Sequence, residues 1–325
     1  MLLIRSIWSR PLPLSLLSSP PQPPLSLLLP SLFFFFFYAK QQTSSHSITY
    51  NYSNMLVKES HVDLQTSSGP MRVFIYQPNV PDYPDAKFPG VAVFTEIYQV
   101  TGPLDRFCRQ IASQGYVVAC NESFHEFEPL GSPLAYDVPG TDKGNLYKIE
   151  KELAAYDEDA TLVIDHLISR PDCTGKIGAT GMCLGGHLAF RAAFDPRVLA
   201  SVCYFATDIH SETLGKGKNS DSLKRIPEIQ GEVVMIFGKQ DNHVPRAGRD
   251  LIRKTLEDAD VTTTFLEVQA QHAFIRDELS KGRYDAAISK VCFELLLELF
   301  HRNLHLDMGP RKGPKRNTKD LPLIC

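Results

Sequence analysis

The sequence predicts a three-layer α/β sandwich, in which a mostly parallel sheet has helices on both faces and an antiparallel strand pair at its N-terminal edge. Two observations lead to this prediction. Short apolar runs of strand length alternate with segments of helical periodicity from about residue 90 to residue 300. Before them, two strand-like segments flank Ser67-Ser68-Gly69, which is typical of a hairpin. Because strands that alternate with helices are joined by right-handed crossovers, most of the sheet should be parallel.

The elements follow one another over residues 55–303, which we predict to form one domain. The hairpin strands are predicted at 57–65 and 71–76. The other strands are predicted where short, mainly apolar runs occur, at 91–94, 116–120, 176–180, 199–205, 233–237 and 262–268. Helices are predicted where apolar residues recur every three or four positions, at 104–114, 153–168, 184–194, 247–259 and 283–301.

Residues 1–54 differ in composition from the rest of the chain, because they contain eleven Ser and seven Pro but no Asp or Glu. An acid-poor, Ser-rich segment is typical of an organellar transit peptide, and the alternative of equal weight is that translation starts at Met55. Secretion and membrane anchoring are less favoured, because the apolar run over 25–39 comes late and Pro30 interrupts it. We therefore expect a cytoplasmic protein if it starts at Met55, and a plastid or mitochondrial one if the leader is a transit peptide.

The overall composition narrows the possible partners. A formal net charge of -3 argues against a general nucleic-acid-binding protein, which is usually basic. Residues 304–325 place basic side chains among Gly, Pro and Asn, which is typical of a flexible, solvated tail. Most internal cysteines fall in apolar runs, so we expect buried thiols rather than disulfides. We expect no stable membrane span, and a monomer or a weak homo-oligomer.

The sharpest pattern for chemistry is Gly181-Met182-Cys183-Leu184-Gly185-Gly186, which lies between a predicted strand and a predicted helix. This is the context of a nucleophile elbow, in which the central side chain projects from a strained turn. The helix N-terminus would favour the Cys183 thiolate, and the Leu184 N–H would be one oxyanion donor. The pattern alone is equally compatible with a small buried Cys at a tight turn.

Two downstream residues favour the catalytic interpretation. Asp241 follows the predicted strand 233–237, and His272 follows the predicted strand 262–268. The order nucleophile, acid, base and the placement at strand ends match α/β-hydrolases. We therefore predict that Cys183 attacks, His272 transfers the proton and Asp241 orients the imidazole.

Other polar residues are given structural interpretations. We expect His187, one helical turn after Cys183, to pack under the elbow, and His243 to be a loop residue. His125, Glu126 and Glu128 match no metal-ligand spacing, so no metal site is predicted. We find no phosphate-binding or dinucleotide-binding motif, and no cofactor is predicted.

The chain resembles the dienelactone hydrolases (carboxymethylenebutenolidases) over about residues 90–300. Four motifs agree in order: the elbow 181–186, the segment 238–245 around Asp241, His272-Ala273-Phe274-Ile275-Arg276, and 95–100 with its Glu96. The resemblance implies the three-layer α/β-hydrolase fold. It also implies a cysteine nucleophile acting on small esters or lactones.

The resemblance also assigns roles that spacing alone does not give. It implies that Glu96 lies near Cys183 and controls its ionisation, and that the Ile97 N–H is the second oxyanion donor. Arg276 would bind a substrate carboxylate, and Phe274, in the same motif, is a further predicted substrate-binding residue. A second arginine of the bacterial enzymes has no obvious counterpart; our alignment places Lys143 there, with Tyr147 nearby, as substrate-binding residues. The chemistry therefore transfers better than the particular dienelactone substrate.

We expect a cofactor-free hydrolase of small, dienelactone-like esters or lactones, which acts through a thioester acyl-enzyme and whose substrate could bear a carboxylate. Two alternatives remain open. The first is a non-catalytic or very slow small-molecule receptor on a hydrolase scaffold, and the second is an acyltransferase. Turnover of activated esters distinguishes the receptor from an enzyme, and added nucleophiles distinguish transfer from hydrolysis.

Overall fold

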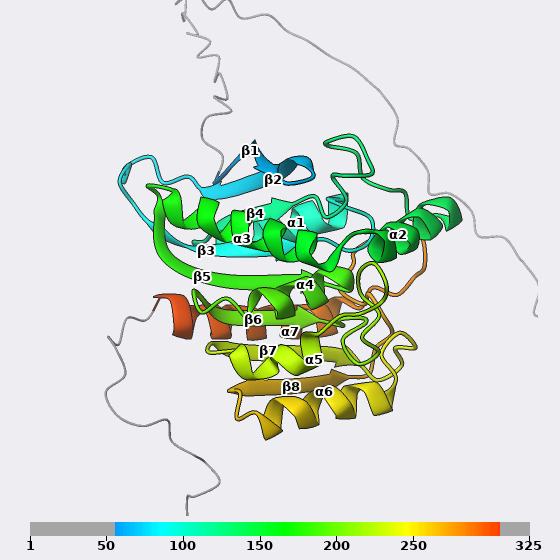
Figure 1. The fold of residues 1–325 in the computed structure, drawn as a ribbon. Helices are drawn as coiled ribbons and strands as arrows, with labels where there is room; N and C mark the ends of the chain where they lie inside the picture. The colour runs from blue at the N-terminus through cyan, green and yellow to red at the C-terminus, as the bar shows by residue number, and fades with distance from the viewer. Residues whose placement is uncertain (1–55, 306–325) are drawn as a thin grey trace, which may run out of the picture. The chain divides into compact units, whose positions relative to one another are not determined.

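The computed structural model describes residues 56–305, so the predicted leader 1–54 and nearly all of the predicted tail 304–325 lie outside the described residues. Within them, one eight-stranded sheet has the order β1-β2-β4-β3-β5-β6-β7-β8 (Figure 1). The strands are β1 Val57–Thr66, β2 Gly69–Pro78, β3 Phe88–Phe94, β4 Val117–Asn121, β5 Cys173–Met182, β6 Val198–Tyr204, β7 Glu232–Gly238 and β8 Thr263–Val268. Strands β3 to β8 are parallel, whereas β1 pairs with β2 and β2 with β4 in antiparallel fashion. The predicted sheet is therefore confirmed.

Helices cover both faces of this sheet. They are α1 Gly102–Ser113, α2 Val138–Glu150, α3 Leu153–Ser169, α4 Leu184–Ala192, α5 Ser222–Arg225, α6 Arg246–Asp258 and α7 Ala286–Phe300, with a 3-10 turn, η2, at Ile226–Glu228. On one face α1 and α7 contribute Phe107, Ile111 and Leu296 to an apolar cluster with the strands. On the other face α3, α4 and α6 form the second cluster. The three-layer prediction is therefore confirmed.

Local sequence explains where the main helices begin. Helix α1 has Pro103 in its first turn, and its buried residues follow the predicted spacing of three and four. Helix α7 begins at Ala286 because the Asp285 side chain accepts a hydrogen bond from the Ile288 N–H at 2.9 Å. Its last turn continues as a π-helical turn, His301–His305, in which Leu304 is buried. The folded part therefore extends at least two residues beyond the predicted limit of 303.

Helix α2 was not predicted, because it has no apolar face. Its two buried residues are Gly140, which lies against the Ala135 backbone just before the helix, and Gly144, which lets the helix approach the segment after β3 closely. A Cβ on Gly144 would lie 2.3 Å from the Ile97 carbonyl oxygen. The sequence signal for this helix is its cap, since the Asp137 carboxylate accepts from the Gly140 N–H at 2.8 Å.

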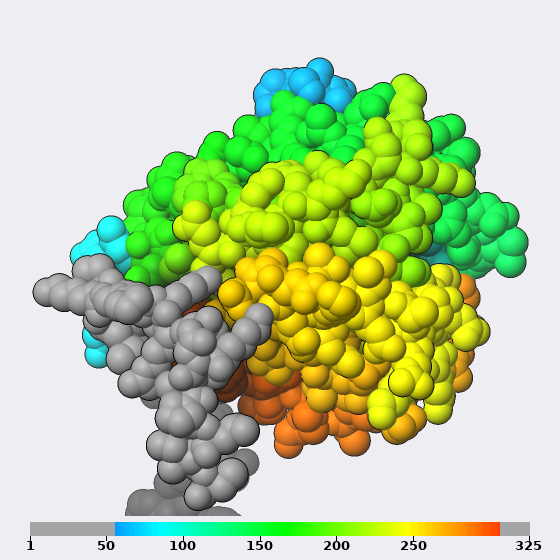
Figure 2. Space-filling view, turned by 60° about the horizontal axis from the view of Figure 1, so that its bottom comes forward, coloured from blue at the N-terminus to red at the C-terminus, as the bar shows by residue number. Residues whose placement is uncertain are grey.

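The parallel strands place their carboxyl ends at one edge of the sheet, which is where α/β proteins bind ligands. Figure 1 shows α2 and the loop segments after β4 and β8 at this edge. At the lateral edge formed by β8, α6 packs against that strand, and Figure 2 shows this helix, in yellow, at the molecular surface. Among residues 56–305, no helix combines the length and the apolar composition that a membrane span requires.

Candidate active site

Cys183 occupies a strained turn between β5 and α4. Its backbone has φ 59° and ψ -117°, a conformation that residues with a side chain rarely adopt. The turn is held on both sides, because the Cys183 N–H donates to the Tyr204 carbonyl at 3.0 Å and the Cys183 carbonyl accepts from the Thr207 N–H at 3.3 Å. Helix α4 starts at the next residue, so its N-terminal dipole favours negative charge on the sulfur.

The glycines of the elbow are required by close backbone contacts. A Cβ on Gly181 would lie 2.3 Å from the Gly185 carbonyl oxygen. A Cβ on Gly185 would lie 2.1 Å from the Phe94 carbonyl oxygen, at the end of β3. The turn can therefore form only when these side chains are absent, and the steric reason for the sequence pattern is present in the structure.

Asp241 and His272 meet beside the elbow. Asp241 lies in the loop after β7, and its Oδ2 is 2.8 Å from His272 Nδ1, in the loop after β8. The other Asp241 oxygen accepts from the His243 N–H at 2.8 Å, which fixes the carboxylate. Both side chains are buried. The Nε2 atom of His272 is thereby left for proton exchange with Cys183.

The electrostatics of these residues favour a charged imidazole. Burial opposes the charge, but the interactions of His272 with Cys183 and Asp241 outweigh it and raise the pKa of His272 to about 10. Burial alone would raise the pKa of Asp241; the hydrogen bond and charge of His272 lower it instead. At neutral pH the arrangement therefore favours an imidazolium at His272, hydrogen-bonded to the Asp241 carboxylate.

Two backbone N–H groups are available beside the sulfur. The Leu184 N–H begins α4, and the Ile97 N–H follows the end of β3; no hydrogen bond within the described residues uses either group. The Ile97 segment is brought toward the elbow by the contact of Gly185 with Phe94 and Thr95. These are the two predicted oxyanion donors.

A cavity of about 110 Å³ opens at Cys183. Its lining comprises Glu96, Ile97, Tyr98, Thr141, Asn145, Lys148, Cys183, Thr207, His243, His272, Arg276, Lys281 and Arg283. Small-molecule pockets usually measure about 300–1,000 Å³, so this one has room for a small acyl group. A larger cavity of about 280 Å³, between α1 and α7, is lined by none of the predicted catalytic residues.

Glu96 and Arg276 form a buried pair in the wall of this cavity. Arg276 Nη1 lies 3.4 Å from Glu96 Oε1, and Arg276 Nε lies 3.2 Å from Glu278 Oε1. The Tyr136 hydroxyl donates to Glu96 Oε2 at 3.4 Å, and the Tyr136 ring lies 4.5 Å from the guanidinium carbon. The guanidinium is therefore already compensated by two carboxylates and an aromatic ring.

Lys143 and Tyr147 do not lie where their predicted role requires. Lys143 Nζ is 3.1 Å from Glu128 Oε1, and the Tyr147 hydroxyl donates to the same oxygen at 2.8 Å. The reason is the face of α2 on which they lie. Thr141, Asn145 and Lys148 line the cavity at helical spacing, whereas positions 143 and 147 share another face. Lys148, which the sequence analysis missed, is the lysine of α2 in the cavity wall.

Phe274, the remaining predicted substrate-binding residue, is also outside the cavity lining. It is fully buried and its ring centroid lies 5.4 Å from that of Phe205. Phe205 in turn lies 4.9 Å from His272. Phe274 thus supports the position of His272 through Phe205.

The two further histidines differ in their surroundings. His187 is buried under the elbow, as predicted; its Nε2 lies 2.7 Å from Ser222 Oγ, and burial lowers its pKa to about 3. His243 was predicted to be a loop residue, and it also lines the cavity, with its ring 4.3 Å from that of His272. Burial and the charge of His272 lower the pKa of His243.

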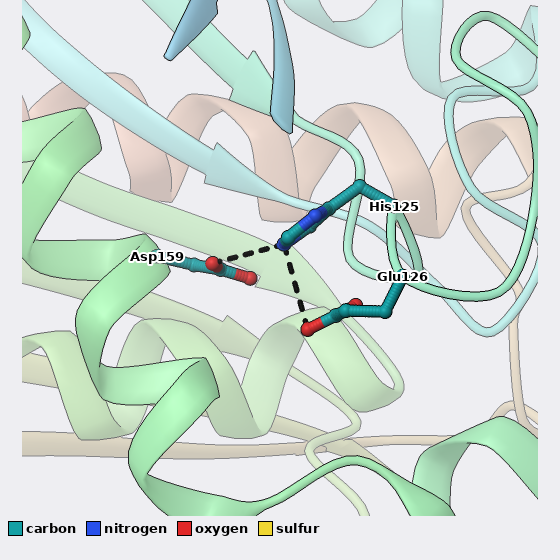
Figure 3. Close-up of side chains that lie close together, drawn as sticks. All are labelled: His125, Glu126 and Asp159. Carbon is teal, nitrogen blue, oxygen red and sulfur yellow. Dashed lines mark hydrogen bonds and ion pairs between the residues drawn. The ribbon is translucent and has the colours of Figure 1, made fainter. Parts of the chain in front are cut away.

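His125, Glu126 and Asp159 gather in the geometry of a possible metal site (Figure 3). His125 Nε2 lies 3.2 Å from Asp159 Oδ1 and 3.5 Å from Glu126 Oε1. The Lys151 ammonium, however, lies 2.6 Å from both Glu126 Oε1 and Asp159 Oδ2. It supplies the positive charge that a cation would supply, so this cluster is a buried ion-pair network that joins the loop after β4 to α3.

Because of this network, we predict that replacing Lys151 destabilises the protein far more than replacing Lys143. In Lys151→Met, the carboxylates of Glu126 and Asp159 lose their buried counter-charge, and we expect a loss of about 3–5 kcal/mol in the free energy of unfolding. Lys143→Met is the matched control, because the Lys143 side chain is 55% exposed and pairs only with Glu128. We expect this substitution to change the free energy of unfolding far less, because an exposed ion pair contributes little to stability. Denaturant unfolding measures both, and equal small effects would contradict the assignment.

The sheet order, the helices on both faces and a nucleophile elbow at the carboxyl ends of the strands define an α/β-hydrolase fold. Residues 71–304 match the dienelactone hydrolase family, and the chain belongs to this family. A Saccharomyces cerevisiae protein named "Putative carboxymethylenebutenolidase" is 55% identical over 262 residues, 78% of this chain and 95% of that protein. The Pseudomonas putida "Carboxymethylenebutenolidase" is 25% identical over 223 residues, 66% of this chain and 85% of its own.

A solved structure supports the fold independently. The "Putative Dienelactone Hydrolase" from Klebsiella pneumoniae superposes with a TM-score of 0.64 at 20% identity, covering 76% of this chain and 99% of that one. The predicted fold class and the resemblance of the sequence to this family are therefore confirmed.

Proposed function

We propose that the chain hydrolyses small esters or lactones through a triad of Cys183, His272 and Asp241 and a thioester acyl-enzyme. Membership of the dienelactone hydrolase family makes it an ester or lactone hydrolase. The observation that carries the finer proposal is the Asp241–His272 hydrogen bond of 2.8 Å beside a thiol on a strained elbow.

The proposed first half-reaction forms the acyl-enzyme. The Cys183 thiolate attacks the carbonyl carbon, and the Ile97 and Leu184 N–H groups stabilise the resulting oxyanion. When the tetrahedral intermediate collapses, the C–O bond breaks and His272 gives its proton to the departing alkoxide. In a lactone the alcohol remains attached to the acyl group.

The second half-reaction releases the product. His272, now neutral, takes a proton from water, and the hydroxide attacks the thioester carbonyl. Collapse of the second intermediate breaks the C–S bond, releases the acid and restores the thiolate beside the imidazolium. Asp241 stabilises the imidazolium and keeps its ring in one orientation in both halves.

Glu96 is proposed to influence the charge at Cys183 from the cavity wall. Its link to Arg276, at 3.4 Å, supports an indirect role in which the buried pair keeps a second negative charge compensated near the thiolate. Arg276 is then a positioning residue for Glu96 in the free enzyme.

The test is turnover combined with intact protein mass. The full chain is incubated with cis-dienelactone, trans-dienelactone and a short-chain aryl ester, with Cys183→Ala as the control. We expect product release and a transient acyl adduct on Cys183. Turnover of a dienelactone would support the substrate class that the name of the Pseudomonas enzyme indicates. Turnover of the aryl ester alone would support the mechanism but indicate that the natural substrate is a different ester. If neither turnover nor an acyl adduct is observed, the proposal is contradicted and a receptor is favoured.

A further inference from the structure

Four cationic side chains line the cavity, but two of them are already neutralised. Lys148 Nζ lies 2.9 Å from Asp208 Oδ2, and both partners are largely buried. Arg276 contacts the carboxylates of Glu96 and Glu278. Neither cation is therefore free to receive a negative group of the substrate without breaking a buried pair.

Lys281 and Arg283 have no such compensation. They line the same cavity, and neither forms an ion pair within residues 56–305. Lys281 is exposed and Arg283 is half-buried, so both lie toward the solvent side of the cavity. They flank Gly282, whose φ is +56°, and a Cβ there would meet no atom within 4 Å.

The loop that carries them has fixed ends. The Asp285 N–H donates to the Phe274 carbonyl at 2.9 Å, and the Ser289 hydroxyl donates to the same oxygen at 3.1 Å. The Ser280 N–H donates to the Glu278 carboxylate, which also pairs with Arg276. Residues 275–284 thus form a closed loop whose base is tied to α7 and whose inner side is tied to the cavity wall.

We infer that Lys281 and Arg283 form an anion-binding subsite at the mouth of the cavity. This subsite selects esters that carry a negatively charged group on the part of the ester that stays outside the cavity. This inference rests on the proposed function and specifies its substrate class. The cavity holds only a small acyl group, so the charge recognised at the mouth belongs to the leaving-group side of the ester.

The test compares two esters with the same acetyl group and the same aromatic ring. 4-Acetoxybenzoate carries a carboxylate on its leaving group, and methyl 4-acetoxybenzoate is its neutral counterpart. The full chain is compared with Lys281→Gln/Arg283→Gln. The control is Lys224→Gln/Lys290→Gln, which removes the same charge from exposed lysines outside the cavity lining.

We expect the double variant at the cavity to raise KM for 4-acetoxybenzoate roughly tenfold, with little change in kcat and no change for the methyl ester. Raising the salt to about 0.5 M should weaken the preference of the wild type for 4-acetoxybenzoate over the methyl ester, because exposed charges are screened. The double variant at the cavity should show no such salt effect. The control variant should behave like the wild type. An unchanged ratio between the two esters, or an equal loss for both, would overturn the subsite.

Failure of the proposed function is distinguished by a binding measurement. If the chain hydrolyses neither ester, calorimetric titration with 4-hydroxybenzoate still reports on the anion subsite. Binding to the wild type that is weakened only in Lys281→Gln/Arg283→Gln would support the subsite without the hydrolase mechanism. No binding, or equal binding to all three proteins, would overturn it.

Discussion

Replacing Cys183 with Ala is expected to reduce kcat/KM for every ester that the chain hydrolyses by roughly 10⁴–10⁶-fold. The substitution removes the only atom that can form the thioester, while Asp241, His272 and the two backbone donors stay in place. It leaves the strained backbone of the elbow as it is, so the melting temperature should change by only a few degrees. Initial rates and thermal unfolding measured on the same preparation check both parts of this prediction.

A second thiol gives the control for this substitution. Cys173 at the start of β5 is buried and lies outside the cavity lining. Cys173→Ala should lower stability modestly and leave kcat/KM within a few-fold of the wild type. If Cys183→Ala folds and retains the wild-type rate, the nucleophile is a different group and the proposed mechanism is wrong.

The sequence allowed the sheet, and the position of Cys183, Asp241 and His272 at its edge, to be predicted because both depend on local signals. Strand β5 ends immediately before Cys183, and the mainly apolar strand β7 ends three residues before Asp241. The glycines of the elbow have no room for a side chain. Strand ends of a parallel sheet meet at one edge, so residues distant in sequence could be brought together by topology alone. In the structure Asp241 contacts His272, and His272 lines the same cavity as Cys183, as this reasoning expects; their catalytic roles stay a prediction.

The other wall of the site could not be predicted in the same way. Helix α2 is held by glycine contacts rather than by an apolar face, so hydrophobic periodicity gives no sign of it. Without the helix there is no way to know that Lys148 faces the cavity while Lys143 faces Glu128. Lys281 and Arg283 belong to a loop between β8 and α7, where neither periodicity nor a motif indicates which side chains turn inward.

Asp241→Asn tests the electrostatic half of the triad. The negative charge of Asp241 favours the imidazolium, so its removal should lower the pKa of His272 from its value of about 10 in the wild type. The imidazolium would then lose its proton at a lower pH, and a neutral His272 can no longer protonate the leaving alkoxide. We expect kcat/KM to fall on the order of 10³–10⁴-fold, and the alkaline limb of its pH profile to move to lower pH.

The rate of Cys183 alkylation by iodoacetamide follows the same change independently of any substrate. Because the imidazolium stabilises the thiolate, alkylation near pH 7 should be slower in Asp241→Asn than in the wild type. Asp82→Asn, an exposed carboxylate in the turn after β2, is the matched control and should leave both profiles unchanged. A slower enzyme whose alkaline limb and alkylation profile both stay in place would mean that Asp241 only orients His272. An unaffected enzyme would remove Asp241 from the mechanism.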